Sequence, residues 1–402
     1  MNRACLAKDT NLHEQKQYAS SIRPIKNNFV RMNNNISVRR CKEYDLYKVF
    51  ELISDIYEKS DGPDVQGKKV LVKPNILSDN DPSRCISTHP VVVEAMVRFL
   101  QSKGATVFVG DSPAVHNNRF RGEKSGIGKV CELTDATWVD FMTNPVEKKV
   151  KNRKVRIAGI VDQVDVIISL PKFKNHELVY FTGAIKNTLG LLPGFSKGLQ
   201  HALHGDRNGF GEFLVDLNEI VTPDYFLMDG IMGMEGPGPG ANGIPVSVGV
   251  LLGSTNPLIL DIIASQIAGY DPMVIPTSRT AFFRKKWLVS QEDIIYDGPD
   301  LDSLIVEGFT KIPVKGNNNI AMQFIMRRIK FMRKLERRPV FLHEKCTGCL
   351  KCVNICPVQA IQPLPGKKTH IILTDSKCIR CFCCSEVCTD NAVDIRKKFF
   401  GV

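Results

Sequence analysis

The stretch CTGCLKCVNICP (346–357) and its counterpart CIRCFCCSEVCT (378–389) decide the organisation of this chain. Nine of the 13 cysteines lie between residues 346 and 388, and eight of them form two copies of the spacing C-x2-C-x2-C-x3-C. This is the ligand spacing of two [4Fe–4S] clusters, in which three cysteines of one run and the last cysteine of the other run hold each cluster. The expected ligands are Cys346, Cys349, Cys352 and Cys388 for the first cluster, and Cys378, Cys381, Cys384 and Cys356 for the second.

Other uses of cysteine-rich segments fit this pattern poorly. A zinc site needs only four thiolates, and its signature is a pair of C-x2-C units rather than a triplet. A disulfide framework is typical of small secreted chains. The ninth cysteine, Cys383, interrupts the second run, and we interpret it as a small buried apolar residue. The second run ends in Thr389 where the first has Pro357, a difference that removes no ligand.

Residues 340–395 resemble a bacterial two-cluster ferredoxin. The resemblance rests on the two cysteine runs, on Ala360-Ile361 and Ala392-Val393 as the closing strands of each half, and on HIILT (370–374) as the start of the second half. It covers about a seventh of the chain. It implies a strand, a cysteine loop with a helix and a second strand, repeated once, and it implies electron transfer.

Composition indicates an ordinary globular protein of two or three domains, with 402 residues, 43% hydrophobic and 24% charged. No apolar run approaches the ~18 residues that a membrane-spanning helix needs. The N-terminal residues MNRACLAKDTNLHEQK lack the apolar core of a signal peptide. Four further cysteines without an evident pairing pattern favour a reducing cytoplasm, and clusters of this kind favour an anaerobic host.

The net charge of +12 is concentrated near the cysteine runs. Seven of the basic residues fall between positions 327 and 338, and the ferredoxin-like part is basic as well. A basic face attracts an acidic redox partner such as a separate ferredoxin or flavodoxin. A solvated linker helix explains the basic run equally well, and contact with anionic lipid is a further alternative. Nucleic acid is not expected, because no recognised binding motif accompanies the charge.

The chain divides into four segments. We expect a disordered polar tail over 1–35, an α/β domain over 36–315, a basic linker helix over 316–338 and the two-cluster domain over 339–402. Strands are expected at 69–73, 106–110, 164–170, 225–228 and 246–252, and helices at 46–58, 90–103, 210–221 and 257–268. Alternation of strands and helices predicts a parallel sheet with helices on both faces.

Polar residues follow four of the predicted strands, in KPN (73–75), GDSP (110–113), PKFKNH (171–176) and DG (229–230). Open parallel sheets bind ligands beyond the carboxyl ends of their strands, so these residues predict one site at the rim of the sheet. The residues expected to bind a cofactor or a small anionic ligand are Lys73, Asn75, Asp111 and Lys174. Those expected to take part in chemistry are Lys172, His176, Lys186, Asp229 and Glu235.

The residue types suggest roles, each with a structural alternative. The lysines suit a carboxylate or phosphate, or they are solvated surface residues. His176, with His201 and His204, suits proton donation or metal binding, or each is a hydrogen-bonded structural histidine. Asp229 and Glu235 suit a metal or a proton, or Asp229 caps a turn. Asp261, at the start of an apolar helix, is expected to be a cap or a buried partner.

Residues 36–310 resemble the family known as domain of unknown function 362. The matching stretches are KPNIL (73–77), THP (88–90), GDSP (110–113), LPKFKNH (170–176), TGAIKNTLGLLPG (182–194), HG (204–205), LVDLN (214–218) and DGIMGMEGPGPG (229–240). The resemblance implies an α/β fold that is often fused to a ferredoxin. At the level of fold it is similar to the cofactor-binding domain of lactate racemase.

Together these features predict an oxidoreductase that passes low-potential electrons from two [4Fe–4S] clusters to a small anionic substrate or cofactor in the α/β domain. The first alternative is a non-catalytic electron carrier or cofactor-maturation subunit of a larger complex. A second alternative is a transferase or isomerase in which the clusters are structural or sensory.

Overall fold

The computed structural model describes residues 32–113, 122–194, 196–204, 206–240, 242–314 and 337–397. Most of the tail expected over 1–35 lies outside these ranges, and so does the linker helix expected over 316–338, apart from its last two residues. In the described residues, no helix combines the length and the apolar character that crossing a bilayer requires.

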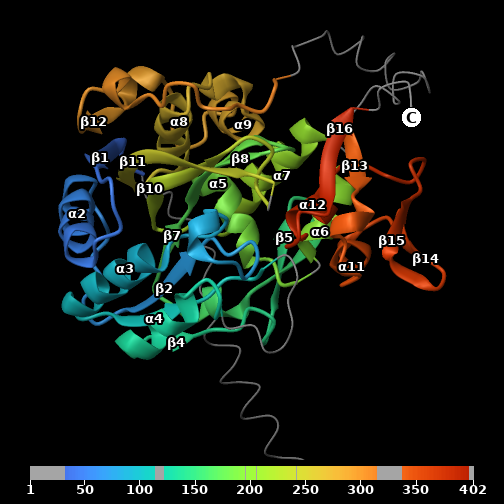
Figure 1. The fold of residues 1–402 in the computed structure, drawn as a ribbon. Helices are drawn as coiled ribbons and strands as arrows, with labels where there is room; N and C mark the ends of the chain where they lie inside the picture. The colour runs from blue at the N-terminus through green and yellow to red at the C-terminus, as the bar shows by residue number, and fades with distance from the viewer. Residues whose placement is uncertain are drawn as a thin grey trace, which may run out of the picture.

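A mixed sheet forms the centre of the large α/β part (Figure 1). Its strands are β1 (Asn35–Arg40), β2 (Lys69–Pro74), β3 (Thr106–Val109), β4 (Thr137–Trp138), β7 (Val166–Leu170), β8 (Lys172–His176), β9 (Tyr180–Thr182), β10 (Tyr225–Glu235), β11 (Ile244–Ser254) and β12 (Ile295–Asp297). The main order is β12-β1-β11-β10-β7-β2-β3-β4, and β8 and β9 extend from β10. The run from β10 to β4 is parallel, whereas β11 is antiparallel to both of its neighbours. The α/β class is therefore confirmed.

Alternating side chains of the central strands pack into two hydrophobic cores, one on each face of the sheet. In β2, Val70 and Val72 pack into one apolar cluster, and Leu71 between them packs into the other. Ile167 and Ile168 of the neighbouring β7 divide in the same way. Successive side chains of a strand point to opposite faces, so a run without polar residues marks a strand that is buried on both.

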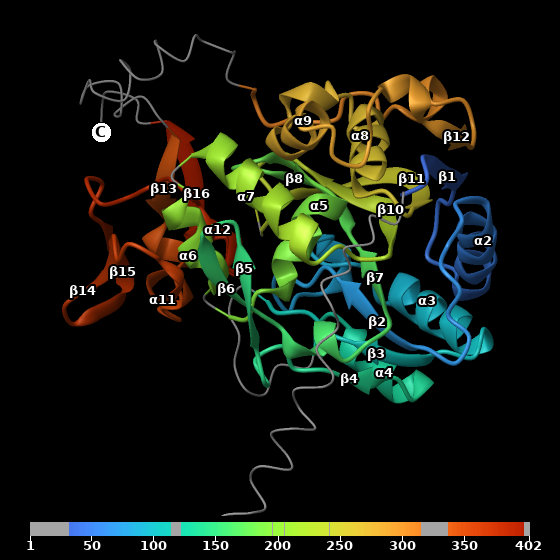
Figure 2. The ribbon, with the colours of Figure 1, turned by 180° about the vertical axis from the view of Figure 1, so that it is seen from behind.

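Helices cover both faces of the sheet (Figures 1 and 2). The core that holds Val70 also takes residues of α2 (Leu46–Lys59), α3 (Pro90–Ser102) and α4 (Ile127–Thr134). The opposite core takes residues of α5 (Ala184–Asn187), α7 (Arg207–Ile220), α8 (Pro257–Ile267) and α9 (Pro276–Phe283). Asp45 caps α2 and Asn256 caps α8 by accepting backbone N–H bonds. The four helices expected from the sequence are confirmed to within three residues at each end.

The segment PKFKNH differs from its prediction. The sequence places these polar residues after a predicted strand and assigns them no strand of their own, but residues 172–176 form strand β8. The reason is β10, which continues to Glu235 instead of ending near residue 228, and so offers an edge to which β8 pairs. Strand β9 then pairs with the other side of β8. The rim residues of this segment are therefore held by strand pairing.

The C-terminal part contains two strand pairs and two short helices. Strand β13 (Arg337–Phe341) pairs with β16 (Val393–Lys397), and β14 (Ile361–Leu364) pairs with β15 (Lys367–Leu373). The helices are α11 (Lys351–Ile355) and α12 (Cys383–Glu386). Both views show this part beside α6 (Ser196–Leu203) and α7 (Figures 1 and 2).

Asp261 yields a test of how the fold positions α5. Its carboxylate, on the second turn of α8, accepts the backbone N–H of Ala184 at 2.5 Å and of Ile185 at 3.2 Å. Asp261→Ala leaves both groups buried without an acceptor, at a cost of about 1–3 kcal/mol each. The thermal unfolding midpoint should fall clearly in this variant and less in Asp261→Asn, which keeps an oxygen acceptor.

The same carboxyl group gives a pH signature. Burial raises the pKa of Asp261 to about 7, although its two backbone hydrogen bonds oppose the shift. A carboxyl pKa that is higher in the folded state stabilises the protein at low pH, and this contribution is lost as pH rises through about 7. Between pH 5 and 8 the unfolding midpoint should therefore decline more steeply in the wild type than in Asp261→Asn. Parallel pH profiles would contradict the assignment.

Candidate metal centres and the adjoining site

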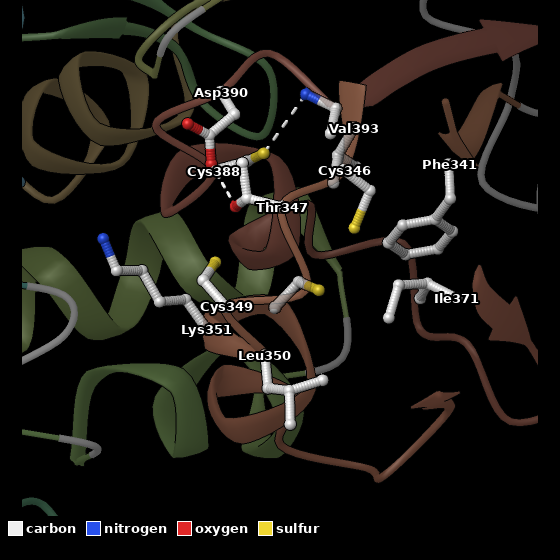
Figure 3. A pocket seen from close by; sticks show the side chains of 12 residues that line it. Phe341, Cys346, Thr347, Cys349, Leu350, Lys351, Ile371, Cys388, Asp390 and Val393 are labelled. Carbon is white, nitrogen blue, oxygen red and sulfur yellow. Dashed lines mark hydrogen bonds between the residues drawn. The ribbon is translucent and has the colours of Figure 1, made fainter. Parts of the chain in front are cut away.

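The first cysteine cavity is lined by residues from both runs. The lining includes Cys346, Cys349, Cys352 and Cys388, the four residues that the spacing groups together. Figure 3 shows the sulfur atoms of Cys346, Cys349 and Cys388 around the space, with Phe341 and Ile371 closing one side. Cys349 is exposed, so this cavity lies near the protein surface.

The second cavity has the complementary composition. Its lining includes Cys356, Cys378, Cys381 and Cys384, together with Cys383. Cys378 and Cys384 are buried, and Cys383 packs against Ile355 and Val387 in a small apolar cluster. The expectation that Cys383 is a buried apolar residue is confirmed.

The two halves of the C-terminal part, one around each cysteine run, share an unusual backbone conformation. Three positions of the first half have positive φ, and each has a positive-φ counterpart 32 residues later, the offset that separates Cys346 from Cys378. These pairs are Gly348 and Arg380, Leu350 and Phe382, and Gln359 and Asn391. The backbone N–H of Ala360 donates to the sulfur of Cys356, and that of Ala392 donates to Cys388, each at 3.2 Å. Such N–H···S bonds stabilise thiolates and tune the potentials of iron–sulfur clusters.

The residues around each cavity fit a multi-iron cluster. Burial, followed by the neighbouring Cys388, Cys349 and Cys346, raises the pKa of Cys352 to about 12. Four thiolates in one apolar cavity require positive charge between them, and a cluster supplies it by binding one iron to each sulfur. In the described ranges, no three His, Cys, Asp or Glu side chains converge on the position of a single ion.

The predicted rim residues form two buried networks in the α/β part. In the first, Lys172 Nζ lies 2.7 Å from Asp229 Oδ2, and both side chains are almost inaccessible to solvent. Tyr44 donates its hydroxyl to Asp229 Oδ1 and accepts from Lys172. The backbone N–H of His89 donates to the other oxygen of Asp229. Lys172 and Asp229 therefore neutralise each other's charge.

The second network contains all four residues expected to bind a cofactor. Lys73 Nζ lies 3.0 Å from Asp111 Oδ1, and both side chains are buried. Lys174 donates to Asn75 Oδ1 at 2.7 Å. Asn187 joins the Lys73–Asp111 pair to the Lys174–Asn75 pair, since its Oδ1 accepts hydrogen bonds from Lys73 and from Asn75. Asn187 was missed by sequence reasoning, although it lies in the matching stretch TGAIKNTLGLLPG.

His176 links the α/β part to the C-terminal part. Its Nε2 lies 3.2 Å from Oε1 of Glu386 on α12, although their orientation falls outside hydrogen-bond geometry. Nδ1 accepts the backbone N–H of Leu178, so the neutral ring carries its proton on Nε2, facing Glu386. Burial lowers the pKa of His176 to about 3. Burial opposes the ionisation of Glu386, but His176 and Lys186 more than offset it and lower the pKa of Glu386 to about 2.

Further contacts join the same surfaces. Asn242 donates to the hydroxyl of Ser385 on α12 and to the backbone oxygen of Val393. A side chain at Gly240 would place its Cβ 2.8 Å from the Cα of Glu386, so only glycine permits this approach. Arg337 forms an ion pair with Glu177 at 2.8 Å. Sequence reasoning missed Glu386, because nothing in the spacing of the cysteines indicates what α12 faces.

The remaining predicted residues lie in different surroundings. Glu235 Oε2 accepts the backbone N–H of Thr310, and it makes no bond to the other rim residues within the described ranges. His204 is half-buried and stacks on Phe213. Lys186 on α5 is half-buried and interacts with Glu386, Cys383 and Lys73. Asp261 is a buried hydrogen-bond acceptor for the start of α5, as expected.

The Lys172–Asp229 pair provides a stability test. Asp229→Ala leaves the ammonium of Lys172 buried without its partner, which typically costs about 3–5 kcal/mol. The unfolding midpoint in denaturant should fall accordingly. Glu235→Gln is the matched control, because the amide oxygen can still accept from Thr310, and it should change stability little. Equal stability of the two variants would contradict a structural role for the pair.

Comparison with known proteins agrees with both parts of this description. The model of the family described as "Domain of unknown function (DUF362)" matches residues 70–266, and a 4Fe-4S binding domain model matches residues 339–362. A thylakoid-associated protein of Synechocystis is 34% identical over 251 residues, which cover 61% of this chain and 78% of the relative. The ferredoxin of Methanothermococcus thermolithotrophicus is 30% identical over 57 residues, which cover 14% of this chain and 92% of the ferredoxin.

Two solved structures show limited similarity. The lactate racemase apoprotein of Thermoanaerobacterium thermosaccharolyticum aligns with a TM-score of 0.39 at 11% identity, over 59% of this chain and 58% of that chain. A Thermotoga maritima protein aligns with a TM-score of 0.35 at 13% identity, over 51% and 54%. This chain thus spans less than two thirds of either structure. By the family match and the Synechocystis relative, the chain belongs to the DUF362 family and carries a 4Fe–4S-binding, ferredoxin-like segment after that domain.

Proposed function

We propose that this protein is an iron–sulfur oxidoreductase that passes low-potential electrons from two [4Fe–4S] clusters to a small anionic substrate or cofactor in the α/β part. The observation that carries the proposal is the position of α12. This helix bears Cys384 of the second cavity, and its Glu386 faces His176 at the end of β8. A cluster in the second cavity would therefore adjoin the rim.

The proposal of two clusters rests on the repetition of the cavity. One run matches the family model, but both halves share the positive-φ positions and the N–H···S bonds. The first cluster would be held by Cys346, Cys349, Cys352 and Cys388, and the second by Cys378, Cys381, Cys384 and Cys356. When bound, the clusters supply one-electron transfer at low potential.

The direction of electron flow follows from exposure. The first cavity, with exposed Cys349, would receive electrons, and the second, against the rim, would deliver them. Exposed Lys345 and Lys368 lie on the segments around the first cavity, so an acidic ferredoxin or flavodoxin is the proposed donor. Free, buried Cys41, Cys85 and Cys131 are consistent with a reducing cytoplasm and an oxygen-poor host.

Within the rim, we assign charge and proton handling to Lys186 and His176. His176 holds a proton on Nε2 beside Glu386, and Lys186 is a cation near the same carboxylate. The Lys172–Asp229 and Lys73–Asp111 pairs are assigned to holding the rim in shape, because each ammonium already has a carboxylate partner.

Iron analysis tests the cluster assignment. Protein purified without oxygen should contain about eight iron and eight sulfide per chain. Cys349→Ala and Cys381→Ala should each lose about half, because each removes one ligand of a different cluster. Cys383→Ala is the control and should retain the full content. Bound zinc, or full iron content in Cys381→Ala, would overturn the assignment.

Reoxidation of the reduced protein tests the oxidoreductase proposal. Holo-protein reduced with dithionite and freed of excess reductant is mixed with the small-molecule fraction of cells that produce it. The visible absorption of the oxidised clusters should return faster with this fraction than with buffer, and Cys381→Ala should abolish the acceleration. If the fraction has no effect while a large reductase copurifies with the protein, the carrier-subunit alternative replaces the proposal.

A further inference from the structure

Two lysines at the junction of the two parts have no partner among the residues that the structure describes. In the described part of the chain, neither Lys186 on α5 nor Lys197 on α6 makes a hydrogen bond or an ion pair. Both side chains are half-buried, so they remain reachable from solvent. Burial lowers the pKa of both, to about 8 for Lys197. Unpaired cations at such positions are costly unless a counter-charge arrives.

The carboxylates nearest these lysines are in contact with other residues. Lys186 and Lys197 interact with each other, with the Lys73–Asp111 pair and with Glu386. Burial lowers the pKa of Lys174 well below its usual value, and its hydrogen-bond acceptors are the neutral oxygens of Asn75 and Ile86, so it is not counted as a cation. Asp111 pairs with Lys73 and Glu386 lies against His176, so within the described residues Lys186 and Lys197 are two ammonium groups without a carboxylate in contact.

A third polar group at the junction is also unsatisfied. Nε2 of His201 is buried and has no hydrogen-bond partner in the described ranges, and the residue is 7% exposed. Nδ1 donates to the backbone oxygen of Lys197 at 2.9 Å, so Nε2 of the neutral ring carries a lone pair. Lys197 and His201 stand four residues apart and share one face of α6. His201 interacts with both Glu386 and Lys186.

The junction lies beside the second cysteine cavity. Cys383 lines that cavity and interacts with Lys186. A Cβ at Gly198 of α6 would lie 3.3 Å from the backbone oxygen of Ile355 on α11. Figures 1 and 2 both show α6 next to α12. A ligand held by these residues would therefore lie between the α/β rim and the second cavity.

We propose that Lys186, Lys197 and His201 bind the phosphate group of a small molecule. A phosphate carries a charge of about −1.5 to −2 near neutral pH, which matches the two ammonium groups of Lys186 and Lys197. Its oxygens accept from the two ammonium groups, and one proton shared between an oxygen and Nε2 of His201 completes the contact. This assignment rests on the proposed function, because it specifies the class of anion at that site.

Comparing the affinities of sulfate and of a dicarboxylate with that of phosphate tests which contacts hold the anion. Sulfate has the shape of phosphate but carries no proton near neutral pH, so it cannot share one with His201. Succinate brings two negative charges on separate carboxylates instead of one compact group. Inorganic phosphate should therefore bind at least about tenfold more tightly than either, a difference of about 1.4 kcal/mol.

Calorimetric titration of oxidised, anaerobically purified holo-protein with inorganic phosphate tests the site. Lys186→Gln and Lys197→Gln should each weaken binding by about tenfold or more, and His201→Phe should remove the preference for phosphate over sulfate. Lys103→Gln, which changes an exposed lysine directly after α3, is the control and should bind like the wild type. Iron content and unfolding midpoint establish that each variant is folded.

The titration and the reoxidation experiment can fail independently, and each failure contradicts a different proposal. Equal affinities for phosphate and sulfate, tighter binding of succinate, or wild-type binding by both lysine variants would overturn the phosphate site. Because the titration uses resting protein, it involves no electron transfer. Failure of reoxidation with intact phosphate binding would refute the oxidoreductase proposal alone.

Discussion

The contact between Glu386 of α12 and His176 of β8 is the interaction on which this account depends. It joins a carboxylate beside the cysteine cavities to a histidine of the sheet rim, at 3.2 Å and out of contact with water. Asn242 and Gly240 hold the same surfaces together by hydrogen bonds and close backbone approach. The proposed electron transfer between the parts would require such proximity.

Two buried ion pairs hold the rim residues in place around this contact. The Lys73–Asp111 and Lys172–Asp229 pairs are almost inaccessible to solvent. Buried pairs of this kind contribute little net stability, but they are costly to break, so they hold their strands in one arrangement. Because Asp111 and Asp229 are already paired, these carboxylates do not neutralise other lysines. Within the described residues, Lys186 and Lys197 are left without a carboxylate in contact, beside the second cavity.

The sequence predicted the features that depend on local spacing. Alternation of strands and helices indicated the α/β class, and the cysteine runs grouped the same eight residues that surround the two cavities. Sequence reasoning missed β8 as a strand, because its pairing depends on the unforeseen length of β10. Glu386, Asn187 and Lys197 acquire their importance only when segments distant in sequence meet. The predicted linker helix lies mostly outside the described residues.

The central claim is that a cluster in the second cavity lies in electrostatic contact with the α/β rim. A redox titration followed by electron paramagnetic resonance tests this most directly, on wild-type holo-protein and on Lys186→Met. Loss of a positive charge disfavours the reduced, more negative cluster, so the potential of the second cluster should fall by an amount on the order of tens of millivolts. The first cluster, identified as the one lost in Cys349→Ala, should change much less. Equal shifts, or no shift in either cluster, would contradict the account.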